Sequence, residues 1–156
     1  MNNETIINKL KDGNKQYVKG GIIGDVSKNR RISNYLNGQS PFALVITCSD
    51  SRVIPEVIFQ QGIGDLFVVR VAGNVVDEFV LGSIEYAIEH LNITCVVVLG
   101  HKNCGAVSSC LNHASGRYVN KLIERISQNI KNEKDYEKAI ELNVKAEVLN
   151  LKQAFA

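Results

Sequence analysis

Three potential metal ligands follow two apolar segments of the chain. Cys48 comes directly after the apolar run 42–47, and His101 and Cys104 follow the run 95–100. Both runs are short and rich in β-branched residues, which is typical of buried strands in a parallel sheet. Ligands bind beyond the carboxyl ends of the strands in such sheets, so we expect two thiols and an imidazole to meet there. These three groups can hold a zinc ion and leave one position open, as catalytic zinc sites do.

The spacing of the second motif supports a shared site. The three-residue step from His101 to Cys104 fits one turn at a helix start, so both side chains can point to the same side. A helix amino terminus also favours a thiolate at Cys104. A thiol redox pair is the main alternative, but the chain contains no Cys-x-x-Cys. The other two cysteines, Cys95 and Cys110, are expected to be small core residues.

Asp50 and Arg52 lie just beyond the first apolar run and are two residues apart. In extended backbone this spacing points both side chains the same way, which allows a charge-assisted pair. On an ordinary surface such a pair contributes about 1 kcal/mol or less. Beside a metal, Arg52 would hold Asp50 ionised, and Asp50 could accept a hydrogen bond from a metal-bound hydroxide. Released from Arg52, Asp50 could become a fourth ligand and close the site; we expect the open state.

Length and composition favour an ordinary globular protein. The 156 residues suit one domain, with 45% apolar and 22% charged residues. The net charge is +2 and the basic residues are interspersed with acids, so we expect no nucleic-acid or membrane partner. The first residues show no signal or transit pattern, and no apolar stretch is long enough to span a bilayer. We therefore expect a cytoplasmic protein.

The hydrophobic pattern predicts helices alternating with strands. Strands are expected over 42–47, 66–71 and 94–99, and a polar loop over 22–40. Helices are expected over 5–18, after Pro55, from 77 or 78 to about 91, around 104–111 and across 122–130. A last helix is expected from about 135 onward, and its apolar residues are Ala139, Leu142, Ala146 and Leu149. This order predicts an α/β fold with a mainly parallel β-sheet flanked by helices. One domain over 1–156 is expected, with an N-terminal helical arm over about 1–20.

Four segments of the chain resemble the β-class carbonic anhydrases. They are Cys48-Ser49-Asp50-Ser51-Arg52, Val69-Arg70-Val71-Ala72-Gly73-Asn74, Ile84-Glu85-Tyr86-Ala87 and Gly100-His101-Lys102-Asn103-Cys104-Gly105. The resemblance holds in order and in spacing, and extends from about Gln39 onward. It is carried most specifically by the combination of Cys-x-Asp-x-Arg with His-x-x-Cys.

The resemblance implies a zinc-dependent lyase that interconverts carbon dioxide and bicarbonate by attack of zinc-bound hydroxide. It makes Cys48, His101 and Cys104 the ligands of one Zn²⁺ per chain, and Asp50 and Arg52 the catalytic dyad. It also implies a homodimer or larger homo-oligomer, with a small apolar substrate pocket near the dimer interface. The residues that the resemblance assigns to substrate binding are Gln39, Phe67, Ala72, Tyr86 and Gly105.

The end of the chain departs from the pattern of the family. Family members usually continue past the last helix into an edge strand, and no such strand is predicted here after Asn143. The expected consequence is an open sheet edge, a weaker dimer, or an abbreviated or truncated form of the family. The alternatives are a carbonyl sulfide or carbon disulfide hydrolase on the same site, and a non-catalytic protein stabilised by zinc. His90 and His113 could carry protons, but we expect both to be ordinary surface histidines.

Overall fold

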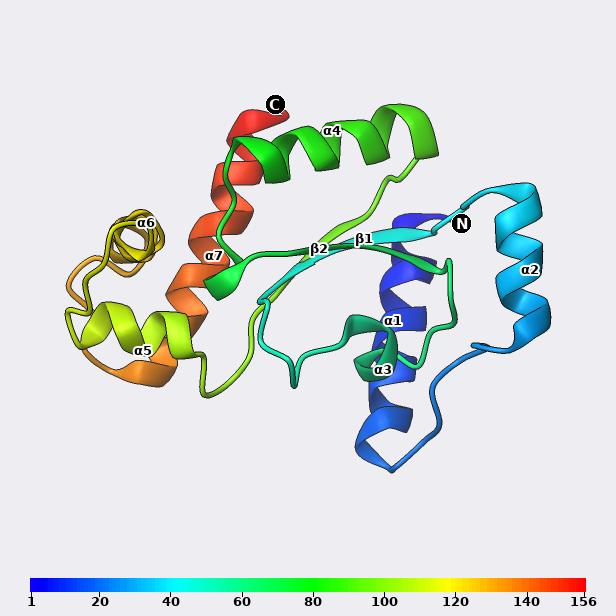
Figure 1. Cartoon of the computed structure of the whole chain (residues 1–156), viewed down its shortest axis with the longest axis horizontal. Coiled ribbons are helices and arrows are strands. Elements are labelled where there is room, and N and C mark those ends of the chain that lie inside the picture. The colour runs from blue at the N-terminus through cyan, green and yellow to red at the C-terminus, as the bar shows by residue number, and fades with distance from the viewer. The chain divides into compact units, whose positions relative to one another are not determined.

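The computed structural model describes all 156 residues and has an α/β fold (Figure 1). Its elements are α1 (Asn3–Val18), α2 (Lys28–Asn37), β1 (Ala43–Thr47), α3 (Pro55–Ile58), β2 (Leu66–Arg70), the 3-10 helix η1 (Ala72–Asn74), α4 (Glu78–Leu91), β3 (Val96–Leu99), α5 (Gly105–Leu111), α6 (Val119–Ile130) and α7 (Tyr136–Ala154). The three strands form one parallel sheet in the order β2-β1-β3, flanked by helices. The predicted fold class is confirmed.

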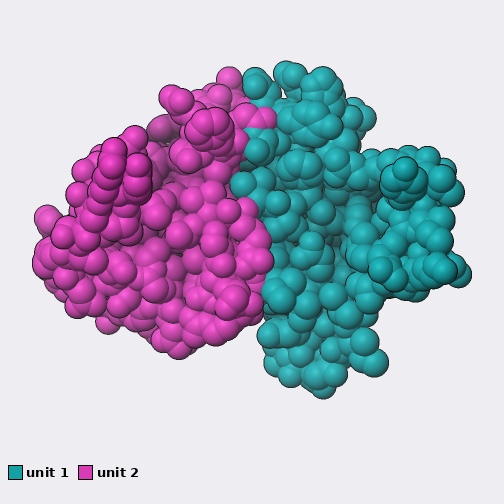
Figure 2. All heavy atoms as spheres, viewed as in Figure 1, with its two compact units in different colours: residues 1–45, 54–69, 83–97 teal, residues 46–53, 70–82, 98–156 magenta.

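The chain divides into two compact units, coloured separately in Figure 2. Unit 1 comprises residues 1–45, 54–69 and 83–97, and unit 2 comprises residues 46–53, 70–82 and 98–156. All three predicted metal ligands and both residues of the predicted dyad belong to unit 2. A single domain over 1–156 stays a prediction.

The middle strand of the sheet is buried along its whole length. All five residues of β1 are buried, which explains why its sequence is a continuous apolar run with no polar alternation. The one hydroxyl in the strand is satisfied, because Thr47 Oγ1 donates to the carbonyl of Leu99 over 2.9 Å. The Thr47 carbonyl accepts from the amide of Val71 over 3.0 Å. These bonds fix the point at which the chain leaves β1 and reaches Cys48.

In unit 1, the first helix agrees with its prediction and the second corrects one. Helix α1 is capped by the side chain of Asn2 and buries Ile6 and Leu10. The loop predicted over 22–40 is wrong, because Lys28–Asn37 forms α2. None of the residues of α2 is buried, and its apolar residues Ile32, Tyr35 and Leu36 stand at helical spacing but are all exposed.

Polar contacts hold α2 in unit 1. Ser27 caps the helix by accepting from the amide of Arg30. The carbonyl of Ile63 accepts from Arg30 Nε over 2.9 Å and from Asn34 Nδ2 over 2.7 Å. Arg30 also forms an ion pair with Asp65 at 2.8 Å. The contacts with Ile63 and Asp65 join residues far apart in the sequence, so they gave no local signal; the helical spacing of Ile32, Tyr35 and Leu36 was the signal that the loop prediction missed.

The core of unit 2 is formed by residues just after β1, just after η1, at the start of α5 and within it, and from α6 and α7. Its buried members are Cys48, Val75, Cys104, Val107, Cys110, Ile126, Ile130 and Ala139. Two of the predicted metal ligands thus lie within an apolar cluster. Cys110 is buried in this core and Cys95 is buried in unit 1, so both are core residues as predicted.

Helix α7 begins where the sequence predicts but buries a different face. Asp135 caps it by accepting from the amide of Lys138. Of the predicted apolar face, Ala139 is buried as predicted, but Leu142 and Leu149 are 37% and 58% exposed, so the prediction was wrong for these two leucines. The face that is buried consists of Ala139, Asn143, Glu147 and Leu151. Two polar residues can lie there because partners on α6 satisfy their side chains.

The chain is helical from Tyr136 to Ala154, so residues 1–156 contain no strand after Asn143. No helix in the structure has the length and apolar character needed to cross a membrane.

The buried carboxylate of α7 leads to a stability prediction. Glu147 is fully buried and accepts two hydrogen bonds from Arg125, each of 2.9 Å. We expect Glu147→Ala to lower the free energy of unfolding by about 3 kcal/mol, because Arg125 would lose its buried partner. Glu141→Ala on the same helix breaks an exposed pair with Lys145 and should cost about 0.5 kcal/mol or less. Equal losses in urea unfolding of the two variants would contradict this account.

Candidate metal centre

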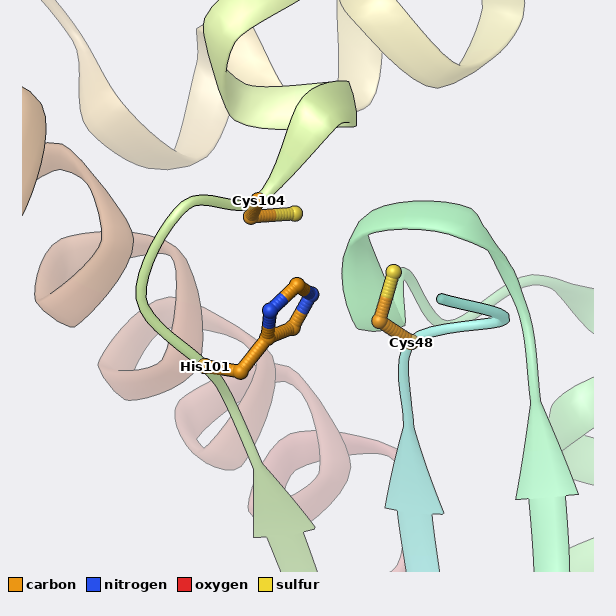
Figure 3. Close-up of side chains that lie close together, drawn as sticks. All are labelled: Cys48, His101 and Cys104. Atoms are coloured by element: carbon orange, nitrogen blue, oxygen red, sulfur yellow. The ribbon is translucent and has the colours of Figure 1, made fainter. Parts of the chain in front are cut away.

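Cys48, His101 and Cys104 face a common space in unit 2 (Figure 3). Cys48 is the first residue after β1, His101 lies two residues after β3, and Cys104 caps α5. Their potential ligand atoms all lie within 4.8 Å of one another. The structure therefore brings the three predicted ligands together, from the carboxyl ends of two neighbouring strands and the start of one helix.

One ring nitrogen of His101 is available to a metal. Its Nδ1 lies 2.8 Å from the carbonyl oxygen of Lys102, so a neutral ring donates there and keeps its lone pair on Nε2. Nε2 is buried and has no hydrogen-bond partner. A buried polar atom without a partner needs an explanation, and a cation that accepts its lone pair supplies one.

The two thiols are buried, and each shifts the pKa of the other. Cys48 and Cys104 are 4% and 2% exposed. A hydrogen bond from the Cys104 thiol lowers the pKa of Cys48, with smaller contributions from His101 and from the backbone amide of Gly73. The same thiol contact, together with burial, raises the pKa of Cys104. These opposite pKa shifts favour a thiolate at Cys48 and a protonated thiol at Cys104, whose proton a bound metal would displace.

This donor set fits zinc. Two thiolate sulfurs and one imidazole nitrogen are ligands that Zn²⁺ takes in proteins, and a tetrahedral ion would keep a fourth position for a small molecule. Hard cations such as Mg²⁺ and Ca²⁺ prefer oxygen ligands and fit the set less well.

Beside the three donors, Arg52 holds Asp50 through two parallel hydrogen bonds. Arg52 Nε lies 2.9 Å from Oδ1 and Nη2 lies 2.7 Å from Oδ2. These bonds hold the pKa of the Asp50 carboxyl well below its usual range. Arg52 Nη2 also donates to the carbonyl of Asn103, over 3.0 Å. In this arrangement Asp50 Oδ2 lies 4.0 Å from His101 Nε2, at the edge of the ligand group.

Two side chains that the sequence did not mark as functional anchor the ligand loops. Arg70 donates to the carbonyl of Cys48 over 3.2 Å and to that of Asp50 over 2.7 Å. The hydroxyl of Tyr136 donates to the carbonyl of Cys104 over 2.8 Å. Arg70 lies inside a segment that carries the family resemblance, but Tyr136 stands at an ordinary helix start and gave no signal.

The residues predicted to bind substrate are divided between the two units. Ala72 and Gly105 belong to unit 2: Ala72 is partly buried in η1, and Gly105 is the exposed first residue of α5. Gln39, Phe67 and Tyr86 belong to unit 1. Gln39 is exposed, and the rings of Phe67 and Tyr86 lie 6.3 Å apart. The roles of all five stay predictions.

Both remaining histidines are exposed. His90 stacks near Tyr86 with ring centroids 5.0 Å apart, and His113 follows the end of α5. These positions agree with the prediction that they are surface histidines.

The opposite pKa shifts of Cys48 and Cys104 predict a pH dependence for the metal-free protein. Cys48 has a lowered pKa when folded, so its contribution to stability is present above the ordinary cysteine pKa of about 9 and is lost as the pH falls. Cys104 has a raised pKa, so its contribution is present below about 9 and is lost as the pH rises. We expect the ultraviolet absorbance of one thiolate to appear in the acid range and to be missing in Cys48→Ser. Absorbance that appears only near pH 9 would contradict the coupling.

Comparison with known sequences identifies relatives over most of the chain. The profile of the family described as carbonic anhydrase matches residues 43–155. Carbonic anhydrase 2 of Mycobacterium tuberculosis is 44% identical over 126 residues, which cover 78% of this chain and 61% of that protein. The carbonic anhydrase of Mycolicibacterium smegmatis is 43% identical over 126 residues, which again cover 78% of this chain and 61% of that protein. The chain thus spans about three fifths of the length of these curated relatives.

Solved structures show the same likeness. A Coccomyxa β-carbonic anhydrase in complex with acetazolamide superposes with a TM-score of 0.68 at 32% identity, over 80% of this chain and 63% of that one. A tetrameric β-carbonic anhydrase from the ascomycete Sordaria macrospora superposes with a TM-score of 0.65 at 27% identity, over 82% of this chain and 76% of that one. With its matched profile, its relatives and its Cys-His-Cys group, the chain belongs to the β-carbonic anhydrase family.

Proposed function

We propose that this protein is a zinc-dependent carbonic anhydrase that reversibly hydrates carbon dioxide to bicarbonate and a proton. The observation that carries the proposal is the group Cys48, His101 and Cys104, with its donor atoms within 4.8 Å, beside a carboxylate that Arg52 holds in place. The relatives described above, which are named carbonic anhydrases, support the same reaction. None of them is named for hydrolysis of carbonyl sulfide or carbon disulfide, so that alternative is not favoured.

The three ligands would hold one Zn²⁺ per chain. When bound, zinc supplies a Lewis acid that lowers the pKa of a coordinated water from about 15.7 toward neutrality and so makes a nucleophile available. The Cys48 and Cys104 thiolates balance the charge of the ion and would moderate this lowering. His101 adds a neutral donor whose orientation is set by its bond to the Lys102 carbonyl.

Asp50 and Arg52 would organise the open position. An ionised carboxylate only accepts hydrogen bonds. A hydroxyl group at the open position would therefore donate a hydrogen bond to Asp50, and this bond would fix its orientation. Arg52 keeps Asp50 ionised and donates a hydrogen bond to each of its oxygens. The carboxylate can then still accept a hydrogen bond, but it is held back from binding the metal.

The substrate would be bound by small apolar contacts and a few donors. Ala72 shares unit 2 with the ligands, as does Gly105 at the start of α5, where backbone amides lack partners within the helix. We assign to Gly105 the donation of a hydrogen bond to the oxygen that gains negative charge during attack. The substrate-binding roles of Gln39, Phe67 and Tyr86, which belong to unit 1, stay predictions from the sequence.

We further propose that the chain assembles as a homodimer or larger homo-oligomer. Helix α2 has no buried residue and exposes Ile32, Tyr35 and Leu36, a set of apolar side chains that a protein partner would cover. The related Sordaria enzymes are described as tetrameric. A cytoplasmic location stays a prediction from the sequence.

Metal content and turnover can be tested together with a matched pair of cysteine variants. The parent should bind one zinc ion per chain and accelerate carbon dioxide hydration in a stopped-flow assay. Cys48→Ser removes a ligand and should lose both properties. Cys110→Ser makes the same chemical change elsewhere in the unit 2 core and should keep both. Turnover in Cys48→Ser equal to that of the parent, or a parent with no rate above buffer, would refute the proposal.

Asp50→Asn separates metal binding from catalysis. Asparagine has the same shape but carries no charge and can turn a donor toward the open position, so we expect zinc content to be unchanged and turnover to fall by about 100-fold. Zinc analysis and stopped-flow hydration of the same sample provide the measurement. Unchanged turnover would show that the Asp50 carboxylate has no part in the reaction.

A further inference from the structure

Unit 2 contains a buried polar network centred on Glu147 of α7. The Glu147 side chain is fully buried, and each of its oxygens accepts two hydrogen bonds. Oε1 accepts from Arg125 Nε over 2.9 Å and from Asn129 Nδ2 over 2.8 Å. Oε2 accepts from Arg125 Nη2 over 2.9 Å and from Asn150 Nδ2 over 3.2 Å. The Glu147 carboxylate therefore has all its hydrogen-bonding positions filled, and it fixes the orientation of the side-chain amides of Asn129 and Asn150.

The network continues from Glu147 to the backbone of η1. Asn129 Nδ2 donates to Asn143 Oδ1 over 2.9 Å as well as to Glu147. Asn143, 1% exposed, donates through Nδ2 to the carbonyl of Gly73 over 2.8 Å. Because Asn129 donates to its oxygen, the Asn143 amide has only one orientation, in which its nitrogen faces Gly73.

Gly73 is the point at which this network reaches a metal ligand. Its amide donates to Cys48 Sγ over 3.2 Å. Its backbone is left-handed, with φ of 68°, and a Cβ here would lie 2.8 Å from Ile126 Cδ1 and 3.1 Å from Ala106 Cβ. The chain at Gly73 is thus held in a conformation that glycine allows, with its carbonyl bound to Asn143 and its amide bound to the thiolate.

We propose that Asn143 is a positioning residue for Cys48: it holds the Gly73 backbone so that the amide donates to Sγ, and Glu147 and Asn129 fix the orientation of Asn143. This inference rests on the proposed metal at Cys48, His101 and Cys104. The amide bond steadies the thiolate and withdraws electron density from it, so it sets both the place of the sulfur and its donor strength toward a metal.

Asn143→Ala and Asn150→Ala form a matched pair for the test. Both remove a carboxamide from α7 near Glu147, but only Asn143 contacts Gly73. Competition with a chelator should show zinc binding about 10- to 100-fold weaker in Asn143→Ala than in the parent and unchanged in Asn150→Ala. In the Co²⁺-loaded proteins, the thiolate-to-cobalt absorption band should move to lower energy in Asn143→Ala alone, because the sulfur loses its hydrogen bond.

The band position distinguishes positioning from folding. If Asn143→Ala only lowers the unfolding midpoint and leaves the cobalt band and zinc affinity of the parent, the inference is overturned. If this variant does not fold, Asn129→Ala decides, since it frees the Asn143 amide without touching Gly73: a shift in the same direction supports the inference, and an unchanged band and affinity overturn it. A parent that binds neither zinc nor Co²⁺ would instead refute the proposed function.

Discussion

Two buried thiols and one imidazole share a single small space in unit 2, and the burial of these three donors is the constraint on which the site depends. Without a cation the opposite pKa shifts favour a thiolate at Cys48 and a protonated Cys104, and His101 Nε2 has no hydrogen-bond partner. A divalent ion bound to all three would satisfy the nitrogen and replace the proton. The donors are placed by the parallel sheet, since Cys48 and His101 follow neighbouring strands, and by the start of α5, where Cys104 is the cap.

The segments that carry these donors are held mainly by side chains from elsewhere in unit 2. Arg70 binds the carbonyls on either side of Ser49, Tyr136 binds the carbonyl of Cys104, and Arg52 joins Asp50 to the Asn103 carbonyl. These contacts connect irregular backbone to helices and strands. They give a physical reason why the ligands can be presented in a fixed arrangement before any metal arrives, which reduces the ordering that binding requires.

Much of the site could be predicted because its information is local. A Cys or His directly after a β-branched run reports the end of a buried strand. Asp50 and Arg52 do pair, but across a turn and not in the extended backbone that was predicted, since the amide of Arg52 donates to Asp50 Oδ1 and that of Val53 to the Asp50 carbonyl. The errors have a different origin. Helix α2 lacks a buried face, and α7 buries Asn143 and Glu147 in place of the leucines that the pattern favoured. Both depend on hydrogen bonds to residues distant in the sequence, such as Asn34 to Ile63 and Arg125 to Glu147, which periodicity cannot reveal.

The most direct test of the account is the ligand shell of zinc in the purified protein, measured by X-ray absorption at the zinc edge. With Cys48, Cys104 and His101 as ligands, zinc should show two sulfur neighbours at about 2.3 Å and at least one nitrogen neighbour at about 2.0 Å. In Cys48→Ser any zinc that remains should show a single sulfur. A shell of nitrogen and oxygen alone in the parent would contradict the assignment of Cys48 and Cys104, and with it the proposed reaction at this site.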